Sequence, residues 1–166
     1  MDYKSKLSVF VLVFLSVPIL ISPPVVGSTN FNLGVEISGH LIPYFGLSQT
    51  VGNREAGVNL GVALPHDLFG SNILDYGYQG TIYYRYAFVN TNFYPGIQTK
   101  VLFSPPSAKE SEFLLMIGGG LEYLDYIGGF RLGGGLQLNL GLPVSALEGF
   151  VGPIPCLSLE SSYEFG

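Results

Sequence analysis

The sequence predicts an all-β protein, a closed antiparallel up-and-down transmembrane β-barrel of eight strands. Three observations lead to this fold class. Segments that alternate apolar and polar residues recur along the chain, the charged residues of these segments fall in the polar phase, and short connections alternate with long ones. Such strands suit a wall with lipid outside and a polar interior, because a closed barrel pairs every backbone group where no water is available.

The composition indicates a surface that faces an apolar medium. Only 11% of the 166 residues are charged, and the chain contains 23 Gly, 12 Phe and 11 Tyr. A soluble domain has about 25% charged residues. After the leader, no apolar run reaches the roughly 20 residues that a membrane-spanning helix needs. The hydrophobicity is therefore distributed, as it is in strands.

The first 28 residues have the pattern of a cleavable secretory signal. Two lysines precede an apolar run over residues 7–21, and two prolines and the small residues Gly27 and Ser28 follow it. This pattern predicts cleavage after Gly27 or Ser28. The run is too short and too interrupted for a membrane-spanning helix. We therefore expect a signal peptide over residues 1–28 and one barrel domain over residues 29–166.

The first two predicted strands cover residues 31–38 and 41–49. In the first, the outward set is Phe31, Leu33, Val35 and Ile37. A three-residue loop at 39–41 would pair Ser38 with Ile42 and keep Phe45 and Leu47 outward. Pro43 cannot donate to the hydrogen-bond ladder, so a bulge or one bent strand over residues 31–48 is an open alternative.

The third and fourth segments continue the alternation. Over residues 55–64 the outward set is Ala56, Val58, Leu60, Val62 and Leu64, opposite Glu55, Gly57, Asn59, Gly61 and Ala63. Over residues 76–88 the outward set is Tyr76, Tyr78, Ile82, Tyr84, Tyr86 and Phe88, opposite Gln79, Thr81, Tyr83 and Arg85. Both segments therefore predict an apolar outer face.

Four more segments complete the wall. Their outward residues are Phe93, Ile97, Val101 and Phe103; Phe113, Leu115, Ile117, Leu121 and Tyr123; Phe130, Leu132, Leu136, Leu138, Leu140 and Leu142; and Leu157, Leu159, Tyr163 and Phe165. Their inward residues include Lys100, Glu122, Arg131 and Glu160. The inward glycines and larger polar residues together predict a largely filled lumen, since an eight-stranded barrel is just wide enough for its own side chains.

The connections alternate in length. Short ones are expected near residues 50–53, 89–92 and 125–129, and longer ones near 65–75, 104–111 and 143–153. Transmembrane barrels have short turns on the periplasmic side and longer loops outside. We expect the loops at 65–75 and 143–153 to be the surfaces that contact an extracellular partner, because loops commonly carry binding residues.

The inward charges predict an ionic network inside the barrel. A Lys or Arg at the bilayer midplane costs roughly 2–4 kcal/mol, which favours inward placement. An enclosed charge must then be paired. The predicted members, with a structural role, are Glu36, Arg85, Lys100, Glu122, Arg131 and Glu160. A selective pathway or gated pore is the alternative role for the same residues.

Other chemistry has little support in the sequence. The net charge of -5 and the scattered basic residues argue against a nucleic-acid partner. The two histidines and Cys156 have no metal-ligand spacing, and one cysteine excludes an intrachain disulfide. His40 and His66, the latter next to Asp67, are expected in polar turns. We therefore assign no catalytic, cofactor-binding or metal-binding residue and do not expect an enzyme.

The C-terminal segment carries a resemblance to a known class. From Leu157 to Phe165 the pattern is Leu-x-Leu-x-Ser-x-Tyr-x-Phe, followed here by Gly166, and the chain contains no Trp. With the alternation, this resembles the small eight-stranded outer-membrane β-barrel proteins, the class that includes the OmpA transmembrane domain. The resemblance implies a bacterial outer membrane, lipid as a partner, and a C-terminal strand that the barrel-insertion machinery reads.

The expected function is a structural or surface-interaction role at the cell envelope. One alternative is a narrow solute channel. Another is a soluble secreted lipocalin-like carrier of an apolar ligand, in which the faces are reversed and the Leu, Ile and Phe side chains point inward. A lipid-modifying outer-membrane enzyme is the least favoured hypothesis.

Overall fold

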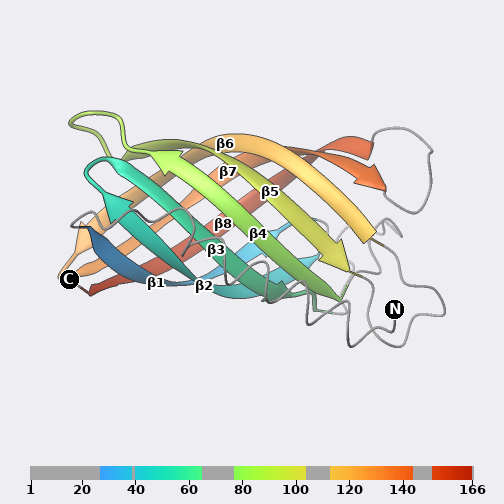
Figure 1. Cartoon of the computed structure of the whole chain (residues 1–166), viewed down its shortest axis with the longest axis horizontal. Helices are drawn as coiled ribbons and strands as arrows, with labels where there is room; N and C mark the ends of the chain where they lie inside the picture. Colours follow the sequence, from blue (N-terminus) through green and yellow to red (C-terminus); the bar gives the residue numbers. More distant parts are fainter. Residues whose placement is uncertain (1–26, 39, 65–76, 104–112, 144–150, 166) are drawn as a thin grey trace.

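The computed structural model describes residues 27–38, 40–64, 77–103, 113–143 and 151–165, which form eight strands closed into one barrel (Figure 1). The strands are β1 (Ser28–Ile37), β2 (Leu41–Val51), β3 (Arg54–Val62), β4 (Tyr78–Tyr86), β5 (Phe93–Phe103), β6 (Phe113–Ile127), β7 (Phe130–Pro143) and β8 (Val151–Phe165). The described part of the chain contains no helix long and apolar enough to cross a membrane.

Each strand pairs antiparallel with the next in sequence, and β1 closes the barrel against β8. The closing register runs from Thr29 opposite Phe165 to Ile37 opposite Leu157. This confirms the predicted all-β, closed, up-and-down barrel of eight strands. The shortest strands have 9 residues, and a tilted strand crosses a bilayer with about 9–11.

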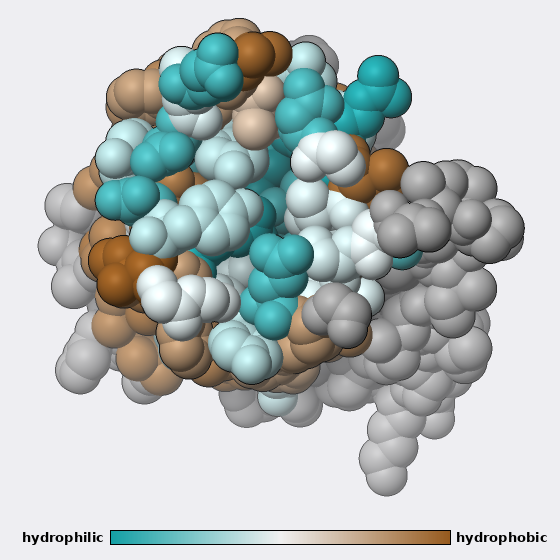
Figure 2. All heavy atoms as spheres, turned by 90° about the vertical axis from the view of Figure 1, so that its left-hand side faces the viewer, coloured by the Kyte–Doolittle hydropathy of each residue, from teal (hydrophilic) through white to brown (hydrophobic). Residues whose placement is uncertain are grey.

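The two faces of the wall have the predicted orientation. Leu136, Leu138 and Leu159 are 53%, 54% and 65% exposed on the outside, whereas Lys100 and Arg131 are buried inside. Seen along the barrel from the end with the short turns, hydrophilic residues fill the middle and hydrophobic residues lie around the margin (Figure 2). This is the opposite of the orientation that a lipocalin-like carrier requires.

Residues 41–49 belong to a separate strand, β2, so the single bent strand is wrong. The predicted register is also wrong: Ile42 lies opposite Glu36, not Ser38. The turn is tighter than expected, with the Ser38 amide donating to the His40 carbonyl at 3.1 Å. Because the register differs by an even number of residues, Phe45 remains on the outer face, and Pro43 also lies there, opposite Val35.

The β2–β3, β4–β5 and β6–β7 turns lie at one end of the barrel, together with the C-terminus (Figure 1). We call this the short-turn end, and we call the opposite end, where the tight β1–β2 turn lies, the long-loop end. Gly52 in the β2–β3 turn and Gly128 and Gly129 in the β6–β7 turn have φ of 61°, 59° and 89°, values that favour glycine. β8 starts at Val151, inside the segment predicted as a loop. The sequence did not indicate this start, because Pro153 and Pro155 interrupt the alternation there. The other predicted loop positions at 65–75, 104–111 and 144–150 lie outside the described residues.

Candidate functional site

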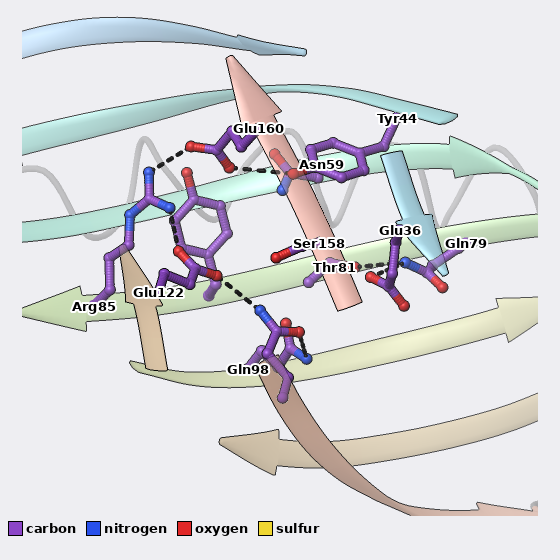
Figure 3. Close-up of a pocket in the computed structure, with 12 residues that line it drawn as sticks. Glu36, Tyr44, Asn59, Gln79, Thr81, Arg85, Gln98, Glu122, Ser158 and Glu160 are labelled. Atoms are coloured by element: carbon purple, nitrogen blue, oxygen red, sulfur yellow. Dashed lines mark hydrogen bonds and ion pairs between the residues drawn. The ribbon is translucent and has the colours of Figure 1, made fainter. Parts of the chain in front are cut away.

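The candidate site is the interior of the barrel, where alternate residues of all eight strands meet (Figure 3). Arg85 on β4 is its central cation. Its Nη2 atom lies 2.7 Å from Glu55 Oε1 and 2.7 Å from Glu160 Oε1, and its Nη1 atom lies 2.5 Å from Glu122 Oε2. One guanidinium therefore joins carboxylates of β3, β6 and β8.

Arg131 on β7 extends this group, which we call the inner cluster: Glu55, Arg85, Glu122, Arg131 and Glu160. Arg131 Nη1 lies 2.5 Å from Glu55 Oε2, and its Nη2 and Nε atoms donate to Ser162 Oγ at 2.9 and 3.2 Å. Two arginines thus bind the two oxygens of Glu55. The Tyr83 hydroxyl donates to Glu55 as well, at 3.1 Å.

Aromatic side chains surround the central arginine. The Arg85 Cζ atom lies 5.0 Å from the centroid of the Tyr83 ring and 5.8 Å from that of Tyr94, both within the range of cation–π attraction. The Tyr44 hydroxyl donates to Glu160 Oε2 at 3.3 Å. The aromatic rings and the three carboxylates together hold the Arg85 guanidinium in one position.

A second ion pair lies closer to the long-loop end. Lys100 Nζ on β5 is 2.6 Å from Glu36 Oε1 on β1, and Lys100 is fully buried. The Gln79 side-chain amide donates to Glu36 Oε2 at 3.2 Å. The pair is thus enclosed, and each partner neutralises the other.

Amide side chains connect the two ionic groups. Gln137 donates to Glu122 Oε1 at 2.7 Å, and its own oxygen accepts from Gln98 and, at 3.5 Å, from Lys100. Gln98 also donates to Asn139 at 2.9 Å. These hydrogen bonds join the inner cluster to the pair of Glu36 and Lys100 across the lumen.

The long-loop end of the lumen has an apolar layer that the sequence analysis missed. Leu102, Leu114 and Met116 are 2%, 3% and 0% exposed and pack together, with Ile154 against them. The sequence does contain an indication of it. Residues 101–103 and 113–117 are continuous apolar runs, so the inward residues of these segments are apolar as well as the outward ones. Apolar packing of this kind disfavours water beside these residues.

Little free space remains between these side chains. The cavity shown in Figure 3 has a volume of about 20 Å³, and its lining includes Glu36, Tyr44, Asn59, Glu122 and Glu160. A space of this size holds about one water molecule. Side chains therefore occupy most of the space around this cavity.

The structure places all six residues of the predicted network in the interior. Arg85, Glu122, Arg131 and Glu160 belong to the inner cluster, and Glu36 and Lys100 form the separate pair. Glu55, which binds both arginines, was predicted to face inward but was not included in the predicted ionic network. Its position in the inward phase of its strand was the signal that could have identified it.

The two histidines and Cys156 were the other residues that the sequence offered as candidates. His40 is largely buried at the long-loop end, and His66 lies outside the described residues. Cys156 is a buried free thiol whose sulfur accepts from Asn139 at 2.9 Å. No group of three or more His, Cys, Asp or Glu that could hold a metal ion occurs within the described ranges.

An eight-stranded antiparallel barrel with an apolar outside and an ion-paired interior defines the class: its fold is that of the small outer-membrane β-barrels. A similar solved structure is the N-terminal β-barrel domain of Pseudomonas aeruginosa OprF, with a TM-score of 0.54 and 15% identity, covering 84% of this chain and 99% of that one. Neisserial surface protein A (NspA) aligns with a TM-score of 0.43 and 9% identity, over 83% and 94% of the two chains. No family model and no curated protein matches the sequence.

Proposed function

We propose that this protein is a bacterial outer-membrane β-barrel with a structural or surface-interaction role at the cell envelope and without a solute pathway through its lumen. The observation that carries the proposal is the filled interior. Five ion pairs and a belt of amides occupy the described lumen, an apolar layer lies toward its long-loop end, and the cavity between them measures about 20 Å³.

The outer surface supports placement in a membrane. Near the short-turn end, Phe93 and Tyr123 lie with ring centroids 5.2 Å apart, and Phe130, Tyr163 and Phe165 form a second group with centroid distances of 5.1 and 5.7 Å. Aromatic girdles of this kind lie at the membrane interface of transmembrane barrels. Because transmembrane barrels have their short turns on the periplasmic side, the short-turn end faces the periplasm in our proposal.

Export and assembly form the second part of the proposal. The signal peptide over residues 1–28 directs the chain out of the cytoplasm, and β8 with its terminal Phe165 is the strand that the insertion machinery binds. A partner outside the cell would meet the loops predicted at 65–75 and 143–153. We propose no catalytic activity, since the interior charges are engaged with one another.

A planar-bilayer recording tests the absence of a pathway. We expect no unitary conductance from the purified, folded protein, because ion-paired and hydrogen-bonded side chains occupy the described lumen. Arg131→Ala removes one arginine of the inner cluster but leaves the apolar layer, so we expect it to be silent too. Defined conductance steps in the unmodified protein would favour the narrow solute channel instead. Steps in Arg131→Ala alone would assign the barrier to the ion pairs.

Localisation requires a separate experiment. We expect the protein to fractionate with outer-membrane lipid, to require detergent for extraction, and to migrate differently on a denaturing gel before and after heating. Recovery in the aqueous extract would contradict the proposal, since something other than lipid would then have to shield the apolar outer surface from water.

A further inference from the structure

The enclosed charges of the barrel do not balance. Among the described residues, four carboxylates face the lumen, Glu36, Glu55, Glu122 and Glu160, against three cations, Arg85, Lys100 and Arg131. Four against three leaves one net negative charge. Because Glu36 and Lys100 neutralise each other, the excess belongs to the inner cluster.

Within the inner cluster, Glu160 is the carboxylate with the least compensation. Arg131 binds Glu55, and Arg85 is divided among three carboxylates. Glu160 Oε1 has Arg85 at 2.7 Å, but Oε2 has the longer contact of 3.3 Å from the neutral Tyr44 hydroxyl. The Glu122 side chain is 17% exposed, compared with 7% for Glu160. An uncompensated enclosed carboxylate is costly, so a positive charge is expected beside it.

The 20 Å³ cavity adjoins this carboxylate and has an oxygen-rich lining. Asn59 and Gln79 line it; they are 9% and 4% exposed, and their amide oxygens have no hydrogen-bond partner among the described residues. The Gln79 nitrogen donates to Glu36, which identifies its oxygen as the unpartnered atom. Asn59 and Glu160 line the same cavity (Figure 3). Hydroxyls of Thr81 and Ser158 belong to the same lining.

We propose that this cavity binds one small monovalent cation of sodium size, held by the Glu160 carboxylate and neutral oxygens of the lining. Carboxylate, amide and hydroxyl oxygens are the ligands that hard cations prefer. One monovalent charge cancels the excess, whereas a divalent ion would reverse it. The Arg85 guanidinium also lines the cavity, but its charge is already included in the balance. The proposed site lies inside the lumen, and its occupancy is independent of whether the barrel conducts.

The test compares salts at constant ionic strength. The folded protein in detergent is heated in sodium chloride and in tetramethylammonium chloride, whose cation is too large for the cavity, and the midpoint of the gel-mobility change is measured. We expect the midpoint to be about 2–4 °C higher in sodium chloride. Equal midpoints would overturn the proposal and assign the compensating charge to a proton.

Two variants locate the effect. Glu160→Gln removes the excess charge and should abolish the difference between the salts, while Glu164→Gln, which changes an exposed carboxylate on the same strand, should retain it. Retention in Glu160→Gln or loss in Glu164→Gln would contradict the assignment. If Glu160→Gln does not fold, the test is the broadening of the ²³Na resonance by the unmodified protein. Broadening that added potassium reverses and tetramethylammonium does not would support the site. Absence of broadening by the protein would overturn the proposal.

Discussion

At the scale of single residues, the interior depends on Arg85. It is 2% exposed and joins three carboxylates from three strands. A buried ion pair adds little stability relative to a well-packed apolar pair, because desolvation offsets the attraction. Removal of one partner is different, since the remaining charge stays enclosed without compensation. Loss of Arg85 would therefore destabilise the barrel mainly because its carboxylate partners would stay enclosed without a compensating charge.

We expect Arg85→Met to lower the free energy of unfolding by about 3–5 kcal/mol, because it leaves Glu122 and Glu160 without their arginine. Arg54→Met is the matched control: Arg54 is an exposed cation on neighbouring β3, and its replacement should change stability little. Urea titration of the protein folded in micelles measures both. Equal losses in the two variants would contradict the role of Arg85.

The pair of Glu36 and Lys100 permits a double-mutant cycle. We expect Lys100→Met and Glu36→Gln each to destabilise the barrel, and the double variant to lose less than the sum of the two single losses, because it leaves no enclosed charge. The same urea titrations measure the coupling. Additive losses would show that the 2.6 Å contact between these residues contributes nothing specific.

At the scale of strands, small residues allow neighbouring elements to approach. Gly34 on β1 lies opposite Tyr44 on β2, whose ring occupies the space above it and whose hydroxyl reaches Glu160. A Cβ atom at residue 34 would lie 2.5 Å from the Leu159 carbonyl oxygen, too close for the backbone to accept without movement. Gly34 thus positions part of the inner cluster.

We expect Gly34→Ala to destabilise the barrel by about 1–3 kcal/mol, as overpacking usually does. Gly119→Ala is the control, because its Cβ would face the outside with its nearest neighbour, the Gly96 carbonyl oxygen, 3.2 Å away. Heat-induced mobility shifts of both variants give the comparison. A more stable Gly34→Ala, or a greater loss in Gly119→Ala, would contradict this packing account.

The strands were the most predictable part of the molecule. A strand with one enclosed face must alternate polar and apolar residues, and this alternation can be read directly from the sequence. The register between β1 and β2 was not predictable, since Ser38 can lie opposite either residue 40 or residue 42 without changing face. Partners within the lumen were also hidden. Alternation places Glu55 and Arg85 inside, but only the closed barrel brings β4 within reach of β6 and β8.

At the scale of the whole molecule, the wall is uneven. β6 and β8 have 15 residues each and β7 has 14, whereas β3 and β4 have 9. The shorter strands, β3 and β4, have the length that a tilted strand needs to cross a bilayer. β6, β7 and β8 are longer than this, so the barrel wall is longer on the side that they form. Closure of β8 on β1 leaves no free strand edge in the described barrel. The fold thus meets the backbone requirement of a membrane.

Fluorescence quenching can measure whether the outer face of the barrel contacts lipid or water. The chain has no Trp, so a single introduced Trp is a clean fluorescent reporter. Leu138→Trp and Leu159→Trp are placed on the outer wall, and Asn53→Trp in a short turn is the aqueous control. In vesicles, we predict that brominated acyl chains quench the two wall reporters and that acrylamide quenches the turn reporter. Wall reporters quenched by acrylamide and unaffected by brominated lipid would contradict a lipid-facing outer wall.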